Sequence, residues 1–235
     1  NGVCAKRSGS RTEDRRSPLV KLLCVSSSRA DIGLQIPVWR ALAERAELEL
    51  HVLLTGMHMA DPVPARAQVP DGIIVHAGGS DMAGAEGAAA HASLVDIQQV
   101  TAGLCAQLEP DLMLVLGDRL DMAPAVFASL PFNIPVAHIH GGDLSYGAMD
   151  DRIRHAITKL SHVHFVASEP AERRVAAMGE EAWRIHRCGA PGLGGQCRRG
   201  SHRCSGIAAD HHRGALCARD VRQFLCPVSD SHRLQ

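Results

Sequence analysis

Four charged or titratable side chains stand directly after two apolar runs in the middle of the chain. The first run ends before Asp118 and Arg119, and the second ends before His140 and Asp143. Carboxylates and imidazoles exchange protons near neutrality when their surroundings tune them, so these residue types suit general acid–base catalysis. Arginine adds a fixed positive charge that pairs with carboxylate or phosphate. This spacing predicts a site for acid–base chemistry on a ligand that carries negative charge.

The two apolar runs, residues 112–116 and 134–139, are predicted strands. Continuous apolar runs of this length suit strands that are covered on both faces, as in a parallel sheet. In open α/β sheets, ligands bind in the crevice beyond the carboxyl ends of the strands. We therefore expect the four side chains to lie on one rim of the sheet.

A third predicted strand, residues 20–26, leads into the polar turn SSSRADIG at 26–33 and then into a helix predicted for 35–45. The free backbone amides at the start of a helix favour anions, phosphates included. Arg29 lies in this turn and is a candidate phosphate ligand through a charge-assisted hydrogen bond. The alternative is that Arg29 is an exposed turn residue without a ligand.

Strand and helix patterns alternate over residues 19–188, which is typical of an α/β protein with a doubly wound parallel sheet, the Rossmann-like arrangement. Further strands are predicted at 48–54, 73–76, 163–166 and 184–188, and further helices at 92–108, 122–129, 150–160 and 171–178. Residues 55–70 are predicted to form a loop, and residues 78–90 a mobile segment rich in glycine and alanine.

Composition limits the class of protein and its partners. The 235 residues include 25 basic and 25 acidic ones, so a formal net charge of zero makes no case for nucleic acid or an anionic membrane as a partner. No apolar run reaches the roughly 18 residues of a membrane span, and no secretory signal opens the chain. We therefore expect a cytoplasmic protein with reduced cysteines.

The two ends of the chain differ from its middle. Residues 1–18 are polar and arginine-rich and are predicted to be a disordered leader, while 189–193 read as an interdomain linker. Residues 194–235 lack helical and strand periodicity and are predicted to be an irregular tail, which a shifted reading frame would explain. A zinc site in this tail is the alternative, but ligand pairs at tight spacing such as CxxC are missing, so no metal site is predicted. The zinc ligands would come from Cys197, His202, Cys204, His211, His212, Cys217 and Cys226.

Six motifs occur in an order that resembles the hydrolysing UDP-N-acetylglucosamine 2-epimerases, the branch that feeds sialic and legionaminic acid synthesis. The motifs are SSSRADIG at 26–33, GDRLD at 117–121, NIPVAHIHGGD at 133–143, DDRIRHAITKLSHVHFVAS at 150–168, MGE at 178–180 and GAPGL at 189–193. The resemblance covers residues 20–193, whereas a GDR motif alone would carry little weight.

The resemblance implies a fold and a reaction. Such enzymes have two Rossmann-like domains in the arrangement of glycosyltransferase type B, with the nucleotide sugar between them. This chain then corresponds to the first domain, and the second is missing from it. The implied reaction is anti elimination of UDP through a glycal, followed by hydration to N-acetylmannosamine, with no metal, nicotinamide or other cofactor. Full-length relatives are expected to be homo-oligomers.

The resemblance also implies roles for single residues. Asp118 and Asp150 match the family's catalytic carboxylates, and Arg154, one helical turn after Asp150, can hold a carboxylate or meet phosphate oxygens. Asp143 stands where this branch usually has glutamate, and His140 stands where some relatives carry a catalytic glutamate. The residues assigned to substrate phosphates or active-site charge are Arg29 and Arg119.

Other functions are also compatible with the sequence. One is the same chemistry on a UDP-2,4-diacetamido-trideoxy sugar. Another is a nucleotide-sugar-binding remnant without turnover; the printed chain is expected to have little or no activity, because a cleft with one wall cannot exclude water. A nicotinamide-dependent oxidoreductase is disfavoured, because the turn after the first strand is SSSRADIG and not GxGxxG.

The candidate residues also have purely structural interpretations. Asp150 can cap its helix, and Asp118 with Arg119 can form a solvated ion pair. His138 alternates with His140 at the end of its strand, so one of the two can be buried and simply hydrogen-bonded.

Overall fold

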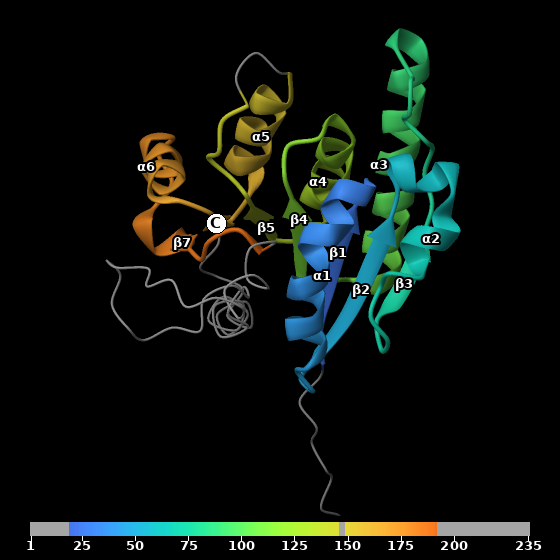
Figure 1. Cartoon of the computed structure of the whole chain (residues 1–235), viewed down its shortest axis with the longest axis horizontal. Coiled ribbons are helices and arrows are strands. Elements are labelled where there is room, and N and C mark those ends of the chain that lie inside the picture. The colour runs from blue at the N-terminus through green and yellow to red at the C-terminus, as the bar shows by residue number, and fades with distance from the viewer. Residues whose placement is uncertain (1–18, 146–148, 192–235) are drawn as a thin grey trace, which may run out of the picture.

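The computed structural model describes residues 19–145 and 149–191, which form a parallel sheet flanked by helices (Figure 1). The seven strands follow the order β3-β2-β1-β4-β5-β6-β7, and each neighbouring pair is parallel. The chain therefore winds outward from β1 in both directions, which confirms the predicted doubly wound α/β fold. The strands are β1 (Val20–Ser26), β2 (Leu48–Leu54), β3 (Ile74–Ala77), β4 (Leu112–Leu116), β5 (Val136–Ile139), β6 (Val163–Val166) and β7 (Ile185–Arg187).

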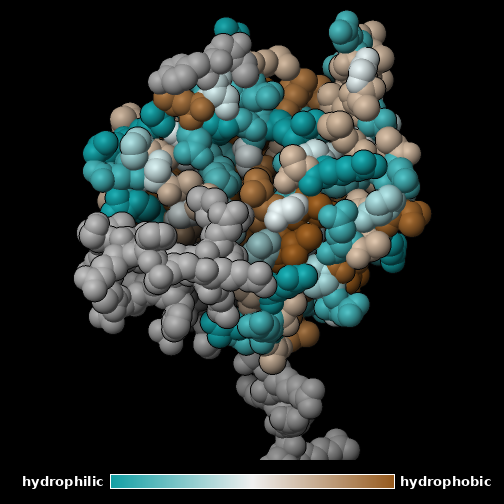
Figure 2. All heavy atoms as spheres, in the orientation of Figure 1, coloured by the Kyte–Doolittle hydropathy of each residue, from teal (hydrophilic) through white to brown (hydrophobic). Residues whose placement is uncertain are grey.

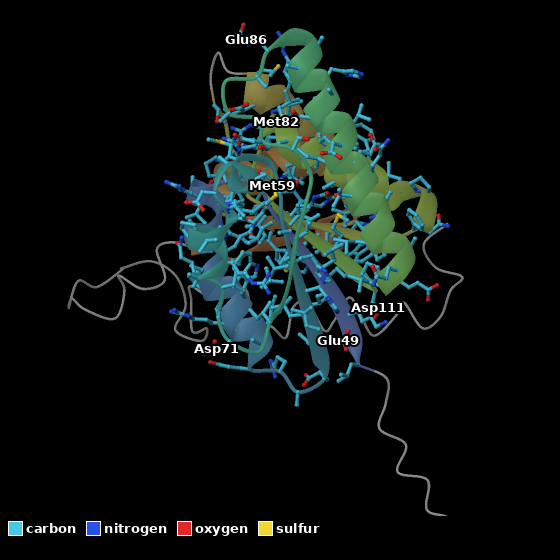
Figure 3. The ribbon with its side chains drawn as sticks, turned by 90° about the vertical axis from the view of Figure 1, so that its right-hand side faces the viewer. Glu49, Met59, Asp71, Met82, Glu86 and Asp111 are labelled. Atoms are coloured by element: carbon cyan, nitrogen blue, oxygen red, sulfur yellow. The ribbon has the colours of Figure 1, made fainter. Side chains whose placement is uncertain are left out.

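Helices cover both faces of the sheet, and Figure 3 shows α1 and α3 on opposite sides of it. The helices are α1 (Arg29–Ala43), α2 (Pro62–Arg66), α3 (Gly87–Leu108), α4 (Ala123–Ser129), α5 (Met149–Leu160) and α6 (Glu169–Ala177). Short 3-10 turns lie at Gly56–Ala60, Leu120–Met122, Leu130–Phe132 and Ala182–Arg184. One core contains Trp39 of α1 and Ala65 of α2, and the other contains Cys105 of α3, Val126 of α4 and Ile157 of α5.

Strand β4 shows why an unbroken apolar run is needed at the centre of this sheet. All five of its residues are buried. Leu112, Leu114 and Leu116 pack into the core on the α1 side, whereas Met113 and Val115 pack into the core under α3, α4 and α5. Since successive side chains of a strand point to opposite faces, a strand covered on both faces buries all of its side chains, and apolar residues satisfy this without needing hydrogen-bond partners.

On the surface over α1 and α2, several hydrophobic side chains remain partly exposed to solvent. Figure 2 shows this face, on which hydrophobic residues gather near the middle and polar residues surround them. Several hydrophobic side chains that pack against the core on this side are only partly buried, among them Leu34, Ile36 and Met59. Val63 of α2 is the most exposed large hydrophobic side chain of the described residues.

Four strands, β1, β2, β4 and β6, have the predicted bounds. The other three are shorter than predicted or shifted by a residue, and α5 starts one residue before the predicted helix. The predicted loop at 55–70 was wrong in part, because it contains the 3-10 turn Gly56–Ala60 and the short helix α2. Helix α3 also begins at Gly87, inside the segment that was predicted to be mobile.

The start of α1 is the largest error among the predicted elements. The helix begins at Arg29 and not at residue 35, because Ser28 caps it: the Ser28 hydroxyl accepts a hydrogen bond from the backbone N–H of Asp31. The first turn carries polar side chains, and the apolar periodicity starts only at Ile32. Because the prediction of this helix rests on apolar periodicity, it assigns the capped polar first turn to a loop.

Parts of the predicted domain organisation lie outside the described residues. The predicted leader, the predicted tail and the end of the predicted linker at 189–193 fall there, together with the candidate zinc ligands. Within 19–145 and 149–191, none of the helices has the length and apolar character that crossing a bilayer requires.

Candidate active site

Polar side chains gather at the carboxyl ends of the central strands. Figure 3 shows the direction of the sheet: Met59 and Met82, which follow β2 and β3, lie at one end, and Glu49 and Asp111 lie at the other. The segments that follow β1, β4 and β5 reach the same end as Met59, because the strands are parallel. We call this the carboxyl-end rim.

Asp118 and Arg154 meet on this rim. Asp118 follows β4 through Gly117, whose φ of +87° suits the tight exit from the strand. Nη2 of Arg154, on α5, donates to the Asp118 carboxylate and also to the Ser145 hydroxyl at 3.0 Å. Arg154 is only 7% exposed, and its Nε and Nη1 atoms are buried without a hydrogen-bond partner in the described part of the chain. A buried guanidinium with two unused donor nitrogens is suited to receive an anionic ligand.

Ser145 ties the loop after β5 to this ion pair. Its hydroxyl lies 3.4 Å from Oδ2 of Asp118, and its backbone N–H donates to Oδ1 of Asp151 at 3.0 Å. The loop that leaves β5 is thereby held against both β4 and α5.

Asp150 lies in the first turn of α5, where its charge reaches Arg119. Burial lowers the pKa of the Arg119 guanidinium, but nearby carboxylates outweigh this effect and raise the pKa above its ordinary value. Those carboxylates belong to Asp121, Asp31 and Asp150. The structure therefore brings Asp150, Asp118, Arg119 and Arg154 to one rim, although they come from two separate stretches of the sequence.

His140 and Asp143 form a pair in the loop after β5. Nδ1 of His140 lies 2.9 Å from Oδ2 of Asp143. Because an ionised carboxylate only accepts hydrogen bonds, Nδ1 carries the hydrogen, and in the neutral ring the lone pair is then on Nε2. That Nε2 atom is buried and has no partner among residues 19–145 and 149–191. His140 adopts a φ of +67°, a conformation that non-glycine residues rarely take outside constrained sites.

His138 has a structural position instead. Its side chain is fully buried, and burial lowers its pKa to about 3, so the ring is neutral at physiological pH. Nε2 donates to the backbone carbonyl of Gly117 at 2.8 Å, and Nδ1 lies 3.2 Å from the Thr158 hydroxyl. His138 thus supports the strand exit that carries Asp118, and of the two histidines it is the fully buried one, with both ring nitrogens in hydrogen bonds within the protein.

A second polar group on the rim was not predicted from the sequence. Its members are Ser27, Asp31, His58 and Asp121, which are each at most 5% exposed, and Arg119, which joins it through Asp121. Burial lowers the pKa of His58, so this ring is neutral at physiological pH. The motifs SSSRADIG and GDRLD contain four of these residues, but the sequence alone does not indicate that they meet.

Arg29 is the predicted residue that stands apart. It is exposed at the first position of α1, and its charge reaches His58, but it does not join the Asp118–Arg154 pair. Within the described residues, no group of three or more histidine, cysteine, aspartate or glutamate side chains has the arrangement needed to hold a metal ion.

The sequence is similar to a known family and to proteins of that family. The family model of UDP-N-acetylglucosamine 2-epimerase matches residues 40–216. A UDP-N,N'-diacetylbacillosamine 2-epimerase (hydrolyzing) of Legionella pneumophila is 38% identical over 184 residues, which cover 74% of this chain and 46% of that protein. A UDP-N-acetylglucosamine 2-epimerase of Neisseria meningitidis is 36% identical over 174 residues, with the same coverage of 74% and 46%.

Solved structures agree with this at the level of the fold. The UDP-GlcNAc 2-epimerase from Neisseria meningitidis, crystallised with UDP-GlcNAc, matches with a TM-score of 0.65 and 19% identity, over 76% of this chain and 49% of that one. An epimerase from Methanocaldococcus jannaschii matches with a TM-score of 0.63 and 19% identity, over 76% and 48%. The chain spans about half the length of the relatives it matches.

Proposed function

The chain belongs to the UDP-N-acetylglucosamine 2-epimerase family, and we propose that it carries the acid–base groups of a hydrolysing UDP-sugar 2-epimerase. The proposed substrate is UDP-N-acetylglucosamine, and the proposed products are UDP and N-acetylmannosamine. The reaction is an anti elimination of UDP to a glycal, followed by hydration. We place it in the cytoplasm, in a homo-oligomeric enzyme that supplies sialic or legionaminic acid synthesis.

The chemistry explains why the rim needs both acids and bases. The proton on C2 of the sugar is not acidic, so its removal has to be coupled to the departure of the diphosphate from C1. One group must take the C2 proton, and positive charge must stabilise the leaving UDP. In the hydration step, a group must deliver a proton to the glycal while water adds. Carboxylates, an imidazole and arginines on one rim supply these functions.

The contact between Arg154 and Asp118 is the observation that carries the proposal. It joins the end of β4 to α5, the helix whose first turn carries Asp150, and the charge of Asp150 acts on Arg119 beside Asp118 in the sequence. Arg154 holds Asp118 with one nitrogen and keeps Nε and Nη1 for a ligand. We assign these two donors to diphosphate oxygens and the two carboxylates to the sugar ring.

His140 is the proposed acceptor of the C2 proton. The hydrogen bond from its Nδ1 to Asp143 leaves the lone pair on Nε2, as a general base requires. Asp143 fixes the ring and compensates the imidazolium that forms, in the manner of an aspartate–histidine pair. Arg29 and Arg119 are assigned to the nucleotide phosphates, Arg119 from within the rim and Arg29 from the exposed start of α1.

A second candidate substrate is a UDP-2,4-diacetamido-trideoxy sugar. The name of the Legionella relative, at 38% identity, supports it about as strongly as the name of the Neisseria relative supports UDP-N-acetylglucosamine. The two substrates differ at C4 and C6 and share the C1–C2 chemistry, so the same rim residues serve both.

The test is incubation of the purified 235-residue chain with each nucleotide sugar in D₂O. Because this chain spans about half of its relatives and is expected to have little activity, the expected results are slow release of UDP, a free 2-epimerised sugar and deuterium at C2, and their rates rank the two substrates. Binding of either sugar nucleotide by calorimetry without UDP release would instead identify a non-catalytic binding protein. Formation of an intact UDP-linked 2-epimer would show that the reaction is not hydrolysing.

A further inference from the structure

We infer that Asp121 is a positioning residue that holds Arg119 for the substrate phosphates, and that Asp31 beside it is a neutral carboxylic acid linked to Asp121 through Ser27. The inference rests on the proposed function for the ligand of Arg119. The neutral state of Asp31 is inferred from the hydrogen-bond geometry around Ser27.

Asp121 holds the Arg119 guanidinium by a fork of two hydrogen bonds. Nε of Arg119 lies 3.2 Å from Oδ1 of Asp121, and Nη2 lies 3.3 Å from Oδ2. Such a two-point contact fixes the plane of the guanidinium as well as its position. Asp121 is 1% exposed while the Arg119 side chain is 35% exposed, so a buried carboxylate orients a cation that reaches the surface of the rim.

The loop after β2 closes over this fork. Sδ of Met57 lies 3.0 Å from Nη2 of Arg119. At Gly56, a side-chain Cβ would come within 2.7 Å of Oδ2 of Asp121, and the backbone has a φ of +56°. Glycine is therefore required here both for its conformation and for the close approach to Asp121.

The Ser27 hydroxyl has one hydrogen but two carboxyl neighbours. Its oxygen lies 2.9 Å from Oδ1 of Asp121 and 3.1 Å from Oδ2 of Asp31. If both carboxyls were ionised, one of these short contacts would join two acceptors without a hydrogen between them. A proton on Asp31 resolves this: Asp31 donates to the Ser27 oxygen, and Ser27 donates to the ionised Asp121 that pairs with Arg119.

The charges around the cluster favour the same arrangement. Asp31 is 5% exposed, and its burial raises its pKa, although hydrogen bonds from Ser28 and Ser27 and the charge of Arg119 oppose this. Two ionised carboxylates at this depth would face a single close cation, and like charges in a buried site disfavour double ionisation. The other titratable groups nearby are His58, which is neutral, and Arg29 and Asp150, whose charges reach His58 and Arg119 respectively.

The first experiment tests the proton on Asp31. Infrared difference spectra between the wild-type chain and D31N at neutral pH should show loss of the carbonyl band of a protonated carboxylic acid. The matched control is D71N, at an exposed aspartate at the opposite end of the sheet (Figure 3), which should leave this band unchanged. If the D31N difference contains only carboxylate bands, Asp31 is ionised and this part of the inference is wrong.

The second experiment tests positioning by a double-mutant cycle of R119A and D121A, with affinity for UDP-N-acetylglucosamine measured by calorimetry. D121A should weaken binding about ten- to a hundredfold, which is the cost of a lost charge-assisted hydrogen bond. The double variant should bind no more weakly than R119A alone, and D121E should recover part of the loss. If the loss of affinity in the double variant equals the product of the losses in the two single variants, Asp121 acts independently of Arg119 and the inference is wrong.

A further measurement separates this inference from the proposed function. The Nε–H of Arg119, held by Asp121, should give a slowly exchanging ¹H–¹⁵N signal that is lost in D121N, a variant of the same shape. E169Q, which removes the carboxylate of an exposed ion pair with Arg173, is the control and should leave that signal unchanged. If wild type binds no nucleotide sugar, the proposed function fails, and this signal still decides whether Asp121 fixes Arg119.

Discussion

The two ends of the sheet carry similar charged residues but use them differently. At the amino ends of β6 and β7, both oxygens of Glu180 are paired, one with Nζ of Lys159 and the other with Nε2 of His164 at 3.2 Å. A shallow hollow of about 500 Å³ lies beside this group. At the carboxyl-end rim, two donor nitrogens of Arg154 and one ring nitrogen of His140 are buried without a hydrogen-bond partner among residues 19–145 and 149–191.

The difference bears on which of the two polar clusters is the proposed ligand site. Glu180 connects the end of α5, strand β6 and the turn after α6, so its hydrogen bonds are used within the protein. Buried polar groups are normally satisfied, and those that are not indicate a ligand or water at that place. At the amino ends, Nδ1 of His164 is also buried without a partner among the described residues, but the rim combines a buried arginine that has two such nitrogens with a carboxylate partner, which supports the rim as the proposed active site. Variants at the two ends should separate effects on substrate from effects on stability.

The largest effect is expected from R154M. Loss of the guanidinium removes the proposed diphosphate donors and leaves Asp118 without its partner, so UDP release should fall about 100- to 1,000-fold. Breaking a mostly buried ion pair should also lower the free energy of unfolding by about 3–5 kcal/mol. UDP release and urea unfolding measure the two effects. R152M, at an exposed position of the same helix, is the control, and equal losses in both variants would contradict the assignment.

The next effect is expected from H140N. Asparagine tolerates the left-handed backbone at this position but cannot act as the base, so deuterium incorporation at C2 should fall about 10²- to 10⁴-fold while sugar-nucleotide affinity changes little. The control is H91Q, at an exposed histidine of α3. Incorporation within twofold of wild type in H140N would remove His140 from the mechanism.

A smaller effect concerns acid stability and His138. The unfolded chain protonates this histidine near 6.5, but the folded chain does so only near its lowered pKa of about 3. As the pH falls from 6.5 toward 3, the unfolded state therefore binds one more proton, and the free energy of unfolding should fall by about 1.4 kcal/mol per pH unit from this group. Urea unfolding as a function of pH should show a shallower slope in H138Q. An unchanged slope would mean that His138 titrates normally in the fold.

The smallest effect is expected at the amino ends. Burial raises the pKa of Glu180, but the hydrogen bond from Lys159 and the contact with His164 outweigh it and lower the pKa below 4.5. E180Q should cost about 1 kcal/mol at pH 7, a modest value because Lys159 is half exposed. This difference in the free energy of unfolding should disappear as the pH falls below 4.5. Glu180 becomes protonated there in the wild type too, so its ionised form no longer stabilises the fold. Calorimetry should show unchanged binding of the sugar nucleotide. Weakened binding would indicate a ligand contact at the amino ends of the strands and would contradict the proposed site at the carboxyl-end rim.

Much of the fold was predictable because its signals are local. Strand β4 is buried on both faces, so an unbroken apolar run marks its bounds directly. The start of α1 was missed because a capped first turn with polar side chains carries no apolar period. The order of the strands was not predicted, since it depends on how distant segments pair.

The sequence by itself determined the alternation of strands and helices, the family, and the charged residues that follow β4 and β5. The tertiary structure alone decided which of those charges meet. Strands β1 and β4 are neighbours in the sheet, which brings Ser27 to Asp121 across 94 positions of sequence, and the packing of α5 brings Arg154 to Asp118 across 36. Apolar periodicity is a property of each segment, whereas a hydrogen bond between segments depends on the register and order of the whole sheet.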